Sequence, residues 1–382
     1  MTGNTNRENP IAIAQQFTSE DRISRIQPFG SGNINDTFLV TLDSPQERHF
    51  ILQKINTQVF RQPQLVMENI STVTQHISHR LQNTNLNRHW KVLAVLVTHD
   101  NRNYYQDSNG SFWRGISFIA NSQSFDIIKD TEQAKEIGYS LGTFHNLISD
   151  LSPAKLADTL PGFHITPLYL EQYHKVLGKT NPPQSTEVKY CLDFICDRSS
   201  GTQCHRAPLS HILETAKAEG KLPLRLMHGD PKINNVLFDI TTNQAISIID
   251  LDTVKPGLVH YDIGDCLRSG CNPVGEETQE WEKIRFEPDL CQGILQGYLS
   301  VAKAFLTEND YIYIYDAIRL IAFELGLRFF TDYLAGNIYF KVKYPEHNLV
   351  RALVQFKLTE SIESQEKTIR SIINDFQISP NF

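Results

Sequence analysis

Hydrophobic residues follow two different spacings along the chain: strand-like runs over roughly the first hundred residues, and a helical repeat from Thr131 onward. In the first part, short apolar or β-branched runs are bounded by turn residues, a pattern typical of a small antiparallel sheet. One helix is predicted inside this part, beginning near Pro63 and continuing through Leu65, Ile70 and Ile77. The predicted strands are residues 26–29, 37–40, 50–55, 92–97, 104–105 and 113–119.

The second part is predicted to be mainly helical. Between Thr131 and Ile148 the apolar residues recur at helical spacing, and two glycines on the same stretch permit close packing. Residues 311–334 are too apolar for a surface helix and predict a buried central one. Within it Arg328 and Asp332 are one turn apart, so they either pair with each other or face a cleft. The pattern therefore indicates an α+β protein of two lobes, 1–120 and 121–382.

A polar loop between two hydrophobic strands carries the strongest chemical signal. Residues 226–239 place Asp230 and Asn235 at the two ends of one turn, with Lys232 between them. The apolar runs 236–238 and 246–249 are separated by turn residues, so a hairpin is predicted to bring Asp250 back beside Asn235. Of the neighbouring residues, His228 is expected to hold the loop and Asp239 to end a strand.

This combination matches what phosphoryl transfer requires. A carboxylate such as Asp230 orients and deprotonates an attacking hydroxyl, and Lys232 neutralises the transferring phosphate. The amide of Asn235 and the carboxylate of Asp250 are suitable oxygen ligands for Mg²⁺ on the phosphates of ATP. Asp252 is on the opposite face of an extended strand from Asp250, so only one of the two is expected to reach the metal. The catalytic set is therefore predicted to be Asp230, Lys232 and Asn235, with Asn235 and Asp250 on the metal.

The strand-rich first part offers a nucleotide site. Glycines around Ser31 form a turn in which backbone amides can approach phosphates, although such a turn is more often an ordinary hairpin. Lys54 is a single lysine in an apolar strand, and Glu68 on the following helix is its expected ion-pair partner. Residues 118–121, at the end of the last strand, are a candidate hinge and adenine contact. The predicted nucleotide-binding residues are Gly30, Ser31, Gly32, Asn33, Lys54, Glu68, Phe118 and Ala120.

Length, charge and cysteine content limit the alternatives. The chain has 382 residues, 40% of them hydrophobic, which is enough for a large core. Its formal charge of −7 disfavours nucleic acid or an anionic membrane as the main partner. No apolar run approaches membrane-spanning length, so a cytoplasmic protein without a membrane partner is expected. The six cysteines are sparse, which favours reduced thiols over a disulfide framework or a zinc site at Cys191, Cys196, Cys204 and His205.

These segments resemble the aminoglycoside phosphotransferase and choline kinase superfamily, and within it the N-acetylhexosamine 1-kinases. The resemblance covers nearly the whole chain and implies a fold similar to that of protein kinases. It also implies roles: Asp230 as catalytic base, Asn235 and Asp250 on Mg²⁺, Lys54 on the nucleotide phosphates and Arg328 on the substrate, with Asp332 near it. The segments that carry it are 30–38, 51–56, 66–70, 141–145, 226–239, 249–257, 261–265 and 328–336.

The expected activity is transfer of the γ-phosphate of ATP to a small-molecule hydroxyl, implied by the resemblance to be the anomeric hydroxyl of an N-acetylhexosamine or related sugar. Ile165 and Pro167 stand where the family pattern would have more polar residues, which leaves the acceptor open. One alternative is a kinase of the same superfamily for choline, ethanolamine, an aminoglycoside or a methylthio sugar. Another is a nucleotide-binding protein without turnover. The sequence leaves monomer and dimer equally open.

Overall fold

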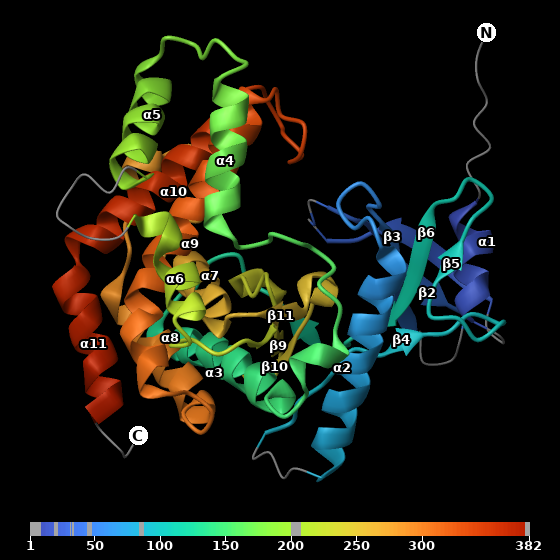
Figure 1. The fold of residues 1–382 in the computed structure, drawn as a ribbon. Coiled ribbons are helices and arrows are strands. Elements are labelled where there is room, and N and C mark those ends of the chain that lie inside the picture. The colour runs from blue at the N-terminus through green and yellow to red at the C-terminus, as the bar shows by residue number, and fades with distance from the viewer. Residues whose placement is uncertain are drawn as a thin grey trace, which may run out of the picture. The chain divides into compact units, whose positions relative to one another are not determined.

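The computed structural model describes residues 9–18, 22–30, 32, 34–43, 48–83, 88–199 and 208–378. Within these ranges the chain forms two compact units. Unit 1 contains Met1–Asn121 together with Ala154–Leu160 and Leu251–Lys255, and unit 2 contains the remainder. Two short segments from later in the sequence thus belong to the first unit. The predicted division into residues 1–120 and 121–382 does not include them in it. The α+β fold with a small antiparallel sheet and many helices is the one expected (Figure 1).

Unit 1 is built on an antiparallel sheet in which β1, β2, β3, β6 and β4 are neighbours in that order and β5 pairs with β6. Ile13, Phe17, Val40 and Leu52 are in its core, covered by the first helix. The predicted strand 92–97 is shorter than expected, because only Val95–Leu96 pair with β6. The elements are α1 (Pro10–Ala14), β1 (Ile23–Pro28), β2 (Asp36–Leu42), β3 (His49–Ile55), α2 (Pro63–Asn83), β4 (Val95–Leu96), β5 (Tyr105–Gln106) and β6 (Phe112–Ser117).

Unit 2 is mainly helical and carries two small sheets, β10-β9-β7 and β11-β8. The predicted hairpin is confirmed, because β9 and β10 pair antiparallel and Asn243 takes the left-handed conformation in their turn. The helices are α3 (Thr131–Ile148), α4 (Thr166–Leu177), α5 (Thr186–Ser199), α6 (Ile212–Ala218), α7 (Val259–Gly270), α8 (Pro288–Ala302), α9 (Glu308–Leu334), α10 (His347–Ser364) and α11 (Glu366–Ile378), and the strands are β7 (Ser122–Gln123), β8 (Arg225–Met227), β9 (Val236–Asp239), β10 (Ala245–Ile248) and β11 (Lys255–Gly257).

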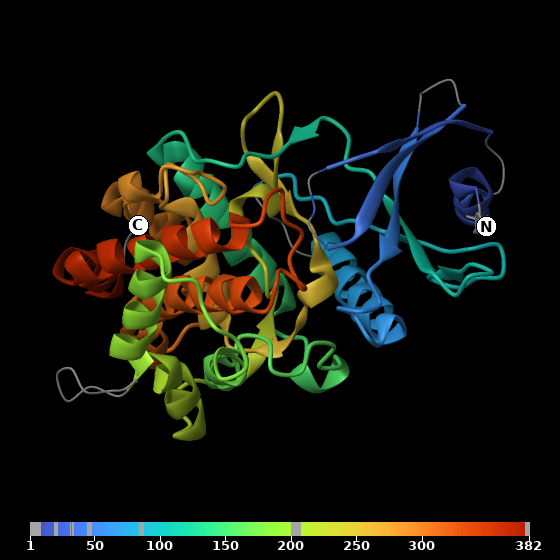
Figure 2. The same ribbon diagram turned by 90° about the horizontal axis from the view of Figure 1, so that it is seen from above.

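The long helix α9 is the centre of unit 2. It packs against α4, α7, α10 and α11, as the ribbon in Figure 2 also shows for its neighbour α10. The expectation of a buried central helix is confirmed, since residues such as Ile318 and Phe323 are fully buried. The close packing expected at Gly138 occurs against α8, where an added Cβ would be 1.8 Å from the carbonyl oxygen of Ile294. A side chain at this position would therefore force α3 and α8 apart.

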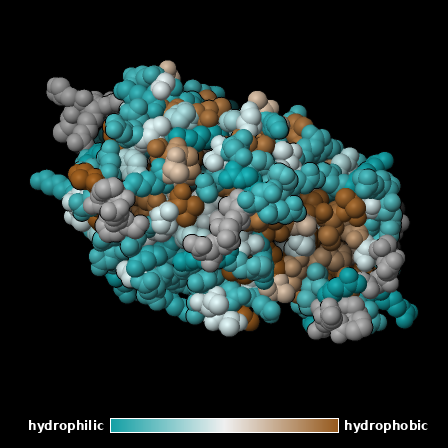
Figure 3. Space-filling view, turned by 90° about the horizontal axis from the view of Figure 1, so that it is seen from below, coloured by the Kyte–Doolittle hydropathy of each residue, from teal (hydrophilic) through white to brown (hydrophobic). Residues whose placement is uncertain are grey.

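The surface and the helices were compared with what a membrane-spanning protein requires. Hydrophilic residues cover most of the face seen from below, and hydrophobic residues are exposed in several smaller areas, the largest towards the right of the view (Figure 3). None of the helices in the described ranges combines the length and apolarity needed to cross a membrane. Cys191, Cys266, Cys271 and Cys291 are buried free thiols, while Cys204 and His205 are outside the described residues.

Candidate active site

The loop between β8 and β9 carries Asp230, Lys232 and Asn235, and backbone contacts fix its shape. His228 Nε2 donates to the carbonyl oxygen of Ile249 at 2.9 Å, and the amide of Asp230 donates to His228 Nδ1 at 3.3 Å. This pattern requires a neutral imidazole protonated at Nε2. Burial accordingly lowers the pKa of His228, against the opposing effect of nearby carboxylates. His228 is thus a structural residue of the loop, as expected.

Asp262 on α7 binds the backbone of the same loop. Its carboxylate is fully buried and accepts from the backbone amides of His228 at 2.6 Å and Gly229 at 2.8 Å. His145 Nε2 donates to it as well, at 2.8 Å. Burial alone would raise the pKa of Asp262, but the hydrogen bonds and the imidazole of His145 lower it below its usual range. A charged carboxylate beneath the loop therefore holds the backbone immediately before Asp230.

Lys232 and Asn235 both contact Asp230. Lys232 Nζ is 2.9 Å from Asp230 Oδ2, and Asn235 Nδ2 donates to the carbonyl oxygen of Asp230 at 2.7 Å. Burial would lower the pKa of Lys232, but the carboxylates of Asp230 and Asp250 raise it, so the lysine keeps its charge. Three of the predicted residues are therefore brought together with Asp250 in unit 2.

The site has oxygen ligands suited to a hard cation. Because Asn235 uses its amide nitrogen on Asp230, its Oδ1 has no hydrogen-bond partner among the described residues. Asp250 follows the hairpin in the left-handed conformation, with φ of 68°. The amide of Ile249 donates to the carbonyl oxygen of Asn235 at 2.9 Å. Because Asp250 directly follows Ile249, this bond keeps Asp250 close to Asn235. An amide oxygen and a carboxylate fit Mg²⁺, which takes its remaining ligands from water and phosphate.

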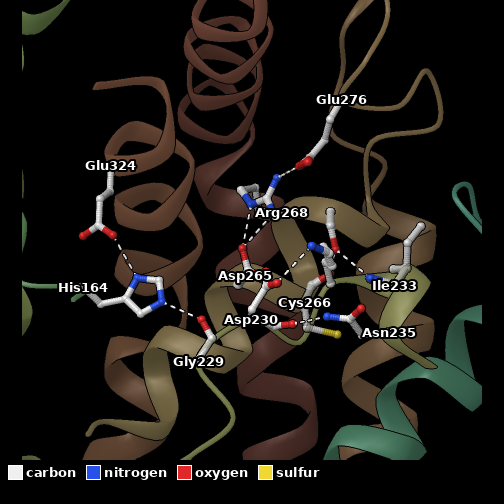
Figure 4. Close-up of polar contacts among 12 residues, drawn as sticks. His164, Gly229, Asp230, Ile233, Asn235, Asp265, Cys266, Arg268, Glu276 and Glu324 are labelled. Carbon is white, nitrogen blue, oxygen red and sulfur yellow. Dashed lines mark hydrogen bonds and ion pairs between the residues drawn. The ribbon is translucent and has the colours of Figure 1, made fainter. Parts of the chain in front are cut away.

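A buried contact between His164 and Glu324 also supports the loop. His164 Nε2 donates to the carbonyl oxygen of Gly229 at 2.9 Å, and its Nδ1 donates to Glu324 Oε1 at 2.8 Å (Figure 4). Both acceptors are oxygens, so the ring carries two protons. Burial would lower the pKa of His164, but Glu324 raises it above the usual value. The other oxygen of Glu324 accepts from Thr166 at 2.6 Å.

Asp265 adds a carboxylate next to Asp230 that has unused hydrogen-bonding capacity. Its Oδ1 accepts from Arg268 Nε at 2.9 Å and Nη2 at 2.7 Å, and Arg268 also pairs with Glu276 (Figure 4). Its Oδ2 is buried without a hydrogen-bond partner in the described part of the chain. Burial raises the pKa of Asp265, opposed by Arg268 and reinforced by Asp230. Asp265 therefore has one buried oxygen without a hydrogen-bond partner among the described residues, close to Asp230.

Arg328 and Asp332 do not pair with each other. The guanidinium of Arg328 is surrounded by rings, 5.3 Å from the centroid of Phe163, 5.0 Å from Tyr169 and 5.6 Å from Phe340. It makes no hydrogen bond or ion pair within the described ranges. The expected role of Asp332 in the substrate site is corrected by its contacts. Its carboxylate is saturated by the amides of residues 338–340 and by Asn348 Nδ2, so it shapes the loop that brings Phe340 to Arg328.

Unit 1 holds the residues predicted to bind nucleotide. The turn between β1 and β2 contains Gly30, with φ of 75°, and Gly32, and neither glycine has any atom within 4 Å of an added Cβ. Backbone in this turn is thus open to a close ligand. Ser31 and Asn33 are outside the described residues. Ala120 is exposed, and its carbonyl oxygen accepts from Lys91 Nζ at 3.3 Å.

The predicted ion pair between Lys54 and Glu68 is wrong for this structure. Glu68 is exposed on α2 and forms no ion pair with the lysine. Lys54 Nζ instead is 5.8 Å from the centroid of the Trp113 ring, on the neighbouring strand β6. Phe118 packs edge-on against Phe29. The helix therefore presents an apolar face to the sheet, and its glutamate points to solvent.

Several functional residues were not singled out from the sequence. Asp262 and Asp265 lie in the quoted segment 261–265, and two carboxylates three residues apart on one helix face were an available signal. His164 directly precedes Ile165, in the segment whose departure from the family pattern left the acceptor open. Its partner Glu324 lies within the apolar helix 311–334. A single acid in such a helix predicts that it is buried with an ionic partner, but the sequence does not say which residue that partner is.

Comparison with known proteins identifies the fold. The chain is similar in fold to an aminoglycoside phosphotransferase from Alicyclobacillus acidocaldarius, with 13% identity, a TM-score of 0.59 and 98% of each chain covered. It is also similar to an amicoumacin kinase solved with AMP-PNP and Ca²⁺, with 13% identity, a TM-score of 0.56 and 94% of each chain covered. A choline kinase from Cryptosporidium parvum gives 14% identity and a TM-score of 0.55, over 95% of this chain and 96% of that one.

These likenesses establish a kinase-like fold, and the sequence match identifies the family. Residues 25–299 match the phosphotransferase enzyme family (APH), which is more than half of the chain. The match includes the loop with Asp230, the hairpin and the helix with Asp262. The protein therefore belongs to the phosphotransferase enzyme family and is a phosphotransferase that acts on an alcohol group of a small molecule.

Proposed function

We propose that this enzyme transfers the γ-phosphate of Mg²⁺-bound ATP to a hydroxyl of a neutral or anionic small molecule. The first candidate is the anomeric hydroxyl of an N-acetylhexosamine or related sugar. The observation that carries the proposal is the grouping of Asp230, Lys232, Asn235 and Asp250 on one loop and its adjoining hairpin. A carboxylate, a cation and two metal-binding oxygens in such proximity are what phosphoryl transfer requires.

Asp230 is the proposed base. Its backbone is held through the neighbouring amides bound by Asp262, and through the carbonyl oxygen of Gly229, which His164 binds. A base fixed in this way can keep an acceptor hydroxyl aligned with the γ-phosphate and accept its proton as the new O–P bond forms and the bond to ADP breaks. Alignment supplies most of the rate in this class of reaction, because the transition state needs little covalent help from the protein.

Lys232 and the proposed metal-binding residues are proposed to offset the negative charge of the phosphates. Asn235 Oδ1 and the carboxylate of Asp250 would hold Mg²⁺, which neutralises the nucleotide phosphates and orients them. The raised pKa of Lys232 keeps its ammonium charged beside Asp230, where it can offset negative charge on the transferring group. Support for a nucleotide and a divalent cation also comes from the amicoumacin kinase, which was solved with AMP-PNP and Ca²⁺.

The nucleotide is proposed to bind unit 1. The open turn with Gly30 and Gly32 suits the phosphates, and Lys54 is the proposed cation for them. Lys54 has no competing ion-pair partner among the described residues, so its charge is available. Phe118 and the backbone at Ala120 are proposed to contact the adenine, and Ser31 and Asn33 the phosphates.

The acceptor class is proposed from the charge of Arg328. A guanidinium ringed by Phe163, Tyr169 and Phe340 already occupies an aromatic cage of the kind that binds ligand cations. A second cation there would be repelled by Arg328, and the carboxylate of Glu324 is already engaged by His164 and Thr166. This disfavours choline, ethanolamine and aminoglycosides, and favours acceptors that offer hydroxyl, carbonyl or anionic oxygens to an arginine.

The experiment is a measurement of ADP release from ATP and Mg²⁺ across free sugars, N-acetylhexosamines, methylthio sugars, choline and aminoglycosides. Asp230→Asn keeps the shape of the side chain but removes the base, so turnover should fall by roughly a thousandfold or more. Turnover of an uncharged sugar, lost in the variant, would establish the reaction. Preferential turnover of choline or an aminoglycoside would contradict the acceptor class, and full activity of the folded variant would contradict the role of Asp230.

A further inference from the structure

Two consecutive glutamates after α7 pair with buried arginines on two different helices of unit 2. Glu276 accepts a hydrogen bond from Arg268 Nη1, on the last turn of α7 (Figure 4). Glu277 Oε1 accepts from Arg351 Nε, on α10, at 2.8 Å. Both arginines are buried, whereas the glutamates are partly exposed. An exposed ion pair contributes little, but removing the partner of a buried charge is costly, so each glutamate matters to the arginine that it binds.

Glu276 acts on the side of the proposed base. Its partner Arg268 also donates from Nε and Nη2 to Asp265 Oδ1, at 2.9 and 2.7 Å. Burial raises the pKa of Asp265, and the charge of Asp230 adds to this effect although Arg268 opposes it. The two carboxylates therefore lie near each other, and Glu276 and Arg268 fix the charged surroundings of Asp230.

Glu277 acts on the loop between α9 and α10, residues 335–346, which we call the α9–α10 loop. Its Oε2 is 3.2 Å from Lys343 Nζ in this loop. Arg351, which is bound to Oε1, donates from Nη1 to the carbonyl oxygen of Lys341 at 3.1 Å. One carboxylate thus holds the C-terminal half of the loop both directly and through a buried arginine.

His347, at the start of α10, adds a third donor to the same carboxylate. The amide of Lys343 donates to His347 Nδ1 at 3.3 Å, so the ring is neutral and its Nε2 donates to Glu277 Oε2 at 3.1 Å. Burial lowers the pKa of His347, in agreement with a neutral ring. Burial would raise the pKa of Glu277, but Arg351 and the neighbouring Lys343 lower it. Glu277 is therefore charged, and both of its oxygens are in use.

The other half of the α9–α10 loop brings Phe340 to Arg328. The centroid of the Phe340 ring is 5.6 Å from the guanidinium of Arg328. Ile338, two residues earlier, is 81% exposed, so burial of apolar surface does little to order this loop. Its shape depends instead on polar contacts, those of Asp332 with the amides of one half and those of Glu277 with the other.

We propose that Glu277 is a positioning residue for the acceptor, which orders the α9–α10 loop and so keeps Phe340 against the guanidinium of Arg328. Its neighbour Glu276 acts separately, on the charges around Asp230. Two adjacent residues of the same type thus serve acceptor binding and phosphoryl transfer independently. The proposal rests on the proposed function in taking Arg328 as the acceptor contact.

The test compares Glu277→Gln with the wild type in two measurements. Glutamine has a single acceptor oxygen, so some of the donors around residue 277 would meet an NH₂ group. Hydrogen exchange at the amides of residues 338–340 should become faster. With the panel acceptor that is turned over fastest, the acceptor KM should rise about tenfold, which corresponds to about 1.4 kcal/mol of lost binding. The kcat at saturating acceptor and the KM of ATP should stay unchanged.

Glu276→Gln is the matched variant, with the same substitution one residue earlier. It should lower kcat about tenfold, which is less than the roughly 100-fold loss from displacing a catalytic group itself by about 1 Å. The acceptor KM and the exchange of residues 338–340 should remain those of the wild type. Glu280→Gln removes an exposed ion pair with Lys283 from the same segment and should change none of these quantities.

The outcomes separate this proposal from the proposed function. Unchanged hydrogen exchange in Glu277→Gln would overturn the proposal even without any turnover, because exchange needs no acceptor. The same kinetic change in Glu276→Gln and Glu277→Gln would overturn it as well, and so would an acceptor KM that responds to Arg328→Leu but not to Glu277→Gln. Faster exchange in Glu277→Gln, with an acceptor KM that neither this variant nor Arg328→Leu alters, would instead count against the proposed acceptor site.

Discussion

Replacing Asp262 with asparagine should damage both stability and turnover, although the change is a single atom. The carboxylate accepts hydrogen bonds from the amides of His228 and Gly229 and from His145 Nε2, among the described residues. Asparagine has only one acceptor oxygen. If that oxygen replaces Oδ2, it keeps the bonds to His228 and His145, and the amide of Gly229 then faces an NH₂ group.

The magnitude follows from these contacts. A buried donor left without a partner costs about 1–3 kcal/mol. The two remaining hydrogen bonds lose their charge assistance, at about 1 kcal/mol each. The expected loss of unfolding free energy is therefore about 3–5 kcal/mol, a large part of the stability of an ordinary domain. The rearranged amides lie directly before Asp230, and a displacement of about 1 Å in a catalytic group can reduce the rate roughly 100-fold.

The assay is urea unfolding together with kcat for the acceptor identified by the panel. Asp310→Asn serves as the control. Asp310 is a fully buried carboxylate that, like Asp262, accepts a hydrogen bond from a backbone amide, that of Thr307, and it also pairs with Arg225. The control should lose stability while its folded fraction keeps the wild-type kcat. The reasoning would be refuted by an Asp262→Asn protein with wild-type unfolding free energy, or by one whose kcat falls no further than that of the control.

The pH dependence of stability should reveal the contact between His164 and Glu324. Burial would lower the pKa of His164, but Glu324 raises it above its usual value of 6.5. The charged contact therefore contributes its full stabilisation below pH 6.5, and this stabilisation is lost as the pH rises through the raised pKa. The difference in unfolding free energy between wild type and His164→Gln should thus be larger at about pH 6 than at about pH 9; a constant difference would exclude a charged histidine. Replacing Arg328 with leucine keeps apolar contact with its rings but removes a charged donor, so the KM of an uncharged acceptor should rise about 10–100-fold with the KM of ATP unchanged. An unchanged acceptor KM would remove Arg328 from the acceptor site.

Local interactions explain why much of this protein could be predicted from its sequence. The hairpin of β9 and β10 depends on a few turn residues and on alternating apolar positions within a short stretch. Asp230, Lys232 and Asn235 share one loop, so their proximity requires no knowledge of the rest of the fold. The glycines of α3 could be assigned to a close helix contact, since few other reasons place a glycine inside a helix.

Side-chain pairing across elements was predicted less well. Lys54 and Glu68 were expected to pair by position, but a helix can rotate so that its glutamate faces solvent while its apolar side still packs on the sheet. Arg328 and Asp332 are close along one helix, yet each finds better partners elsewhere. Aromatic rings from distant segments surround the arginine, and backbone amides of the loop after α9 saturate the aspartate.

The sequence by itself determined most of the elements, the α+β fold class and the phosphotransferase activity, because these depend on periodicity and on residues within a few positions of one another. Only the tertiary structure decided which charges are compensated. Asp262 and His164 hold the loop across long sequence separations, Asp252 is engaged by Arg114, and Arg328 is surrounded by aromatic rings from distant segments. The physical reason is that the energy of a charge depends on its burial and on every neighbour within a few ångströms, and those neighbours are gathered from segments that the chain order does not connect.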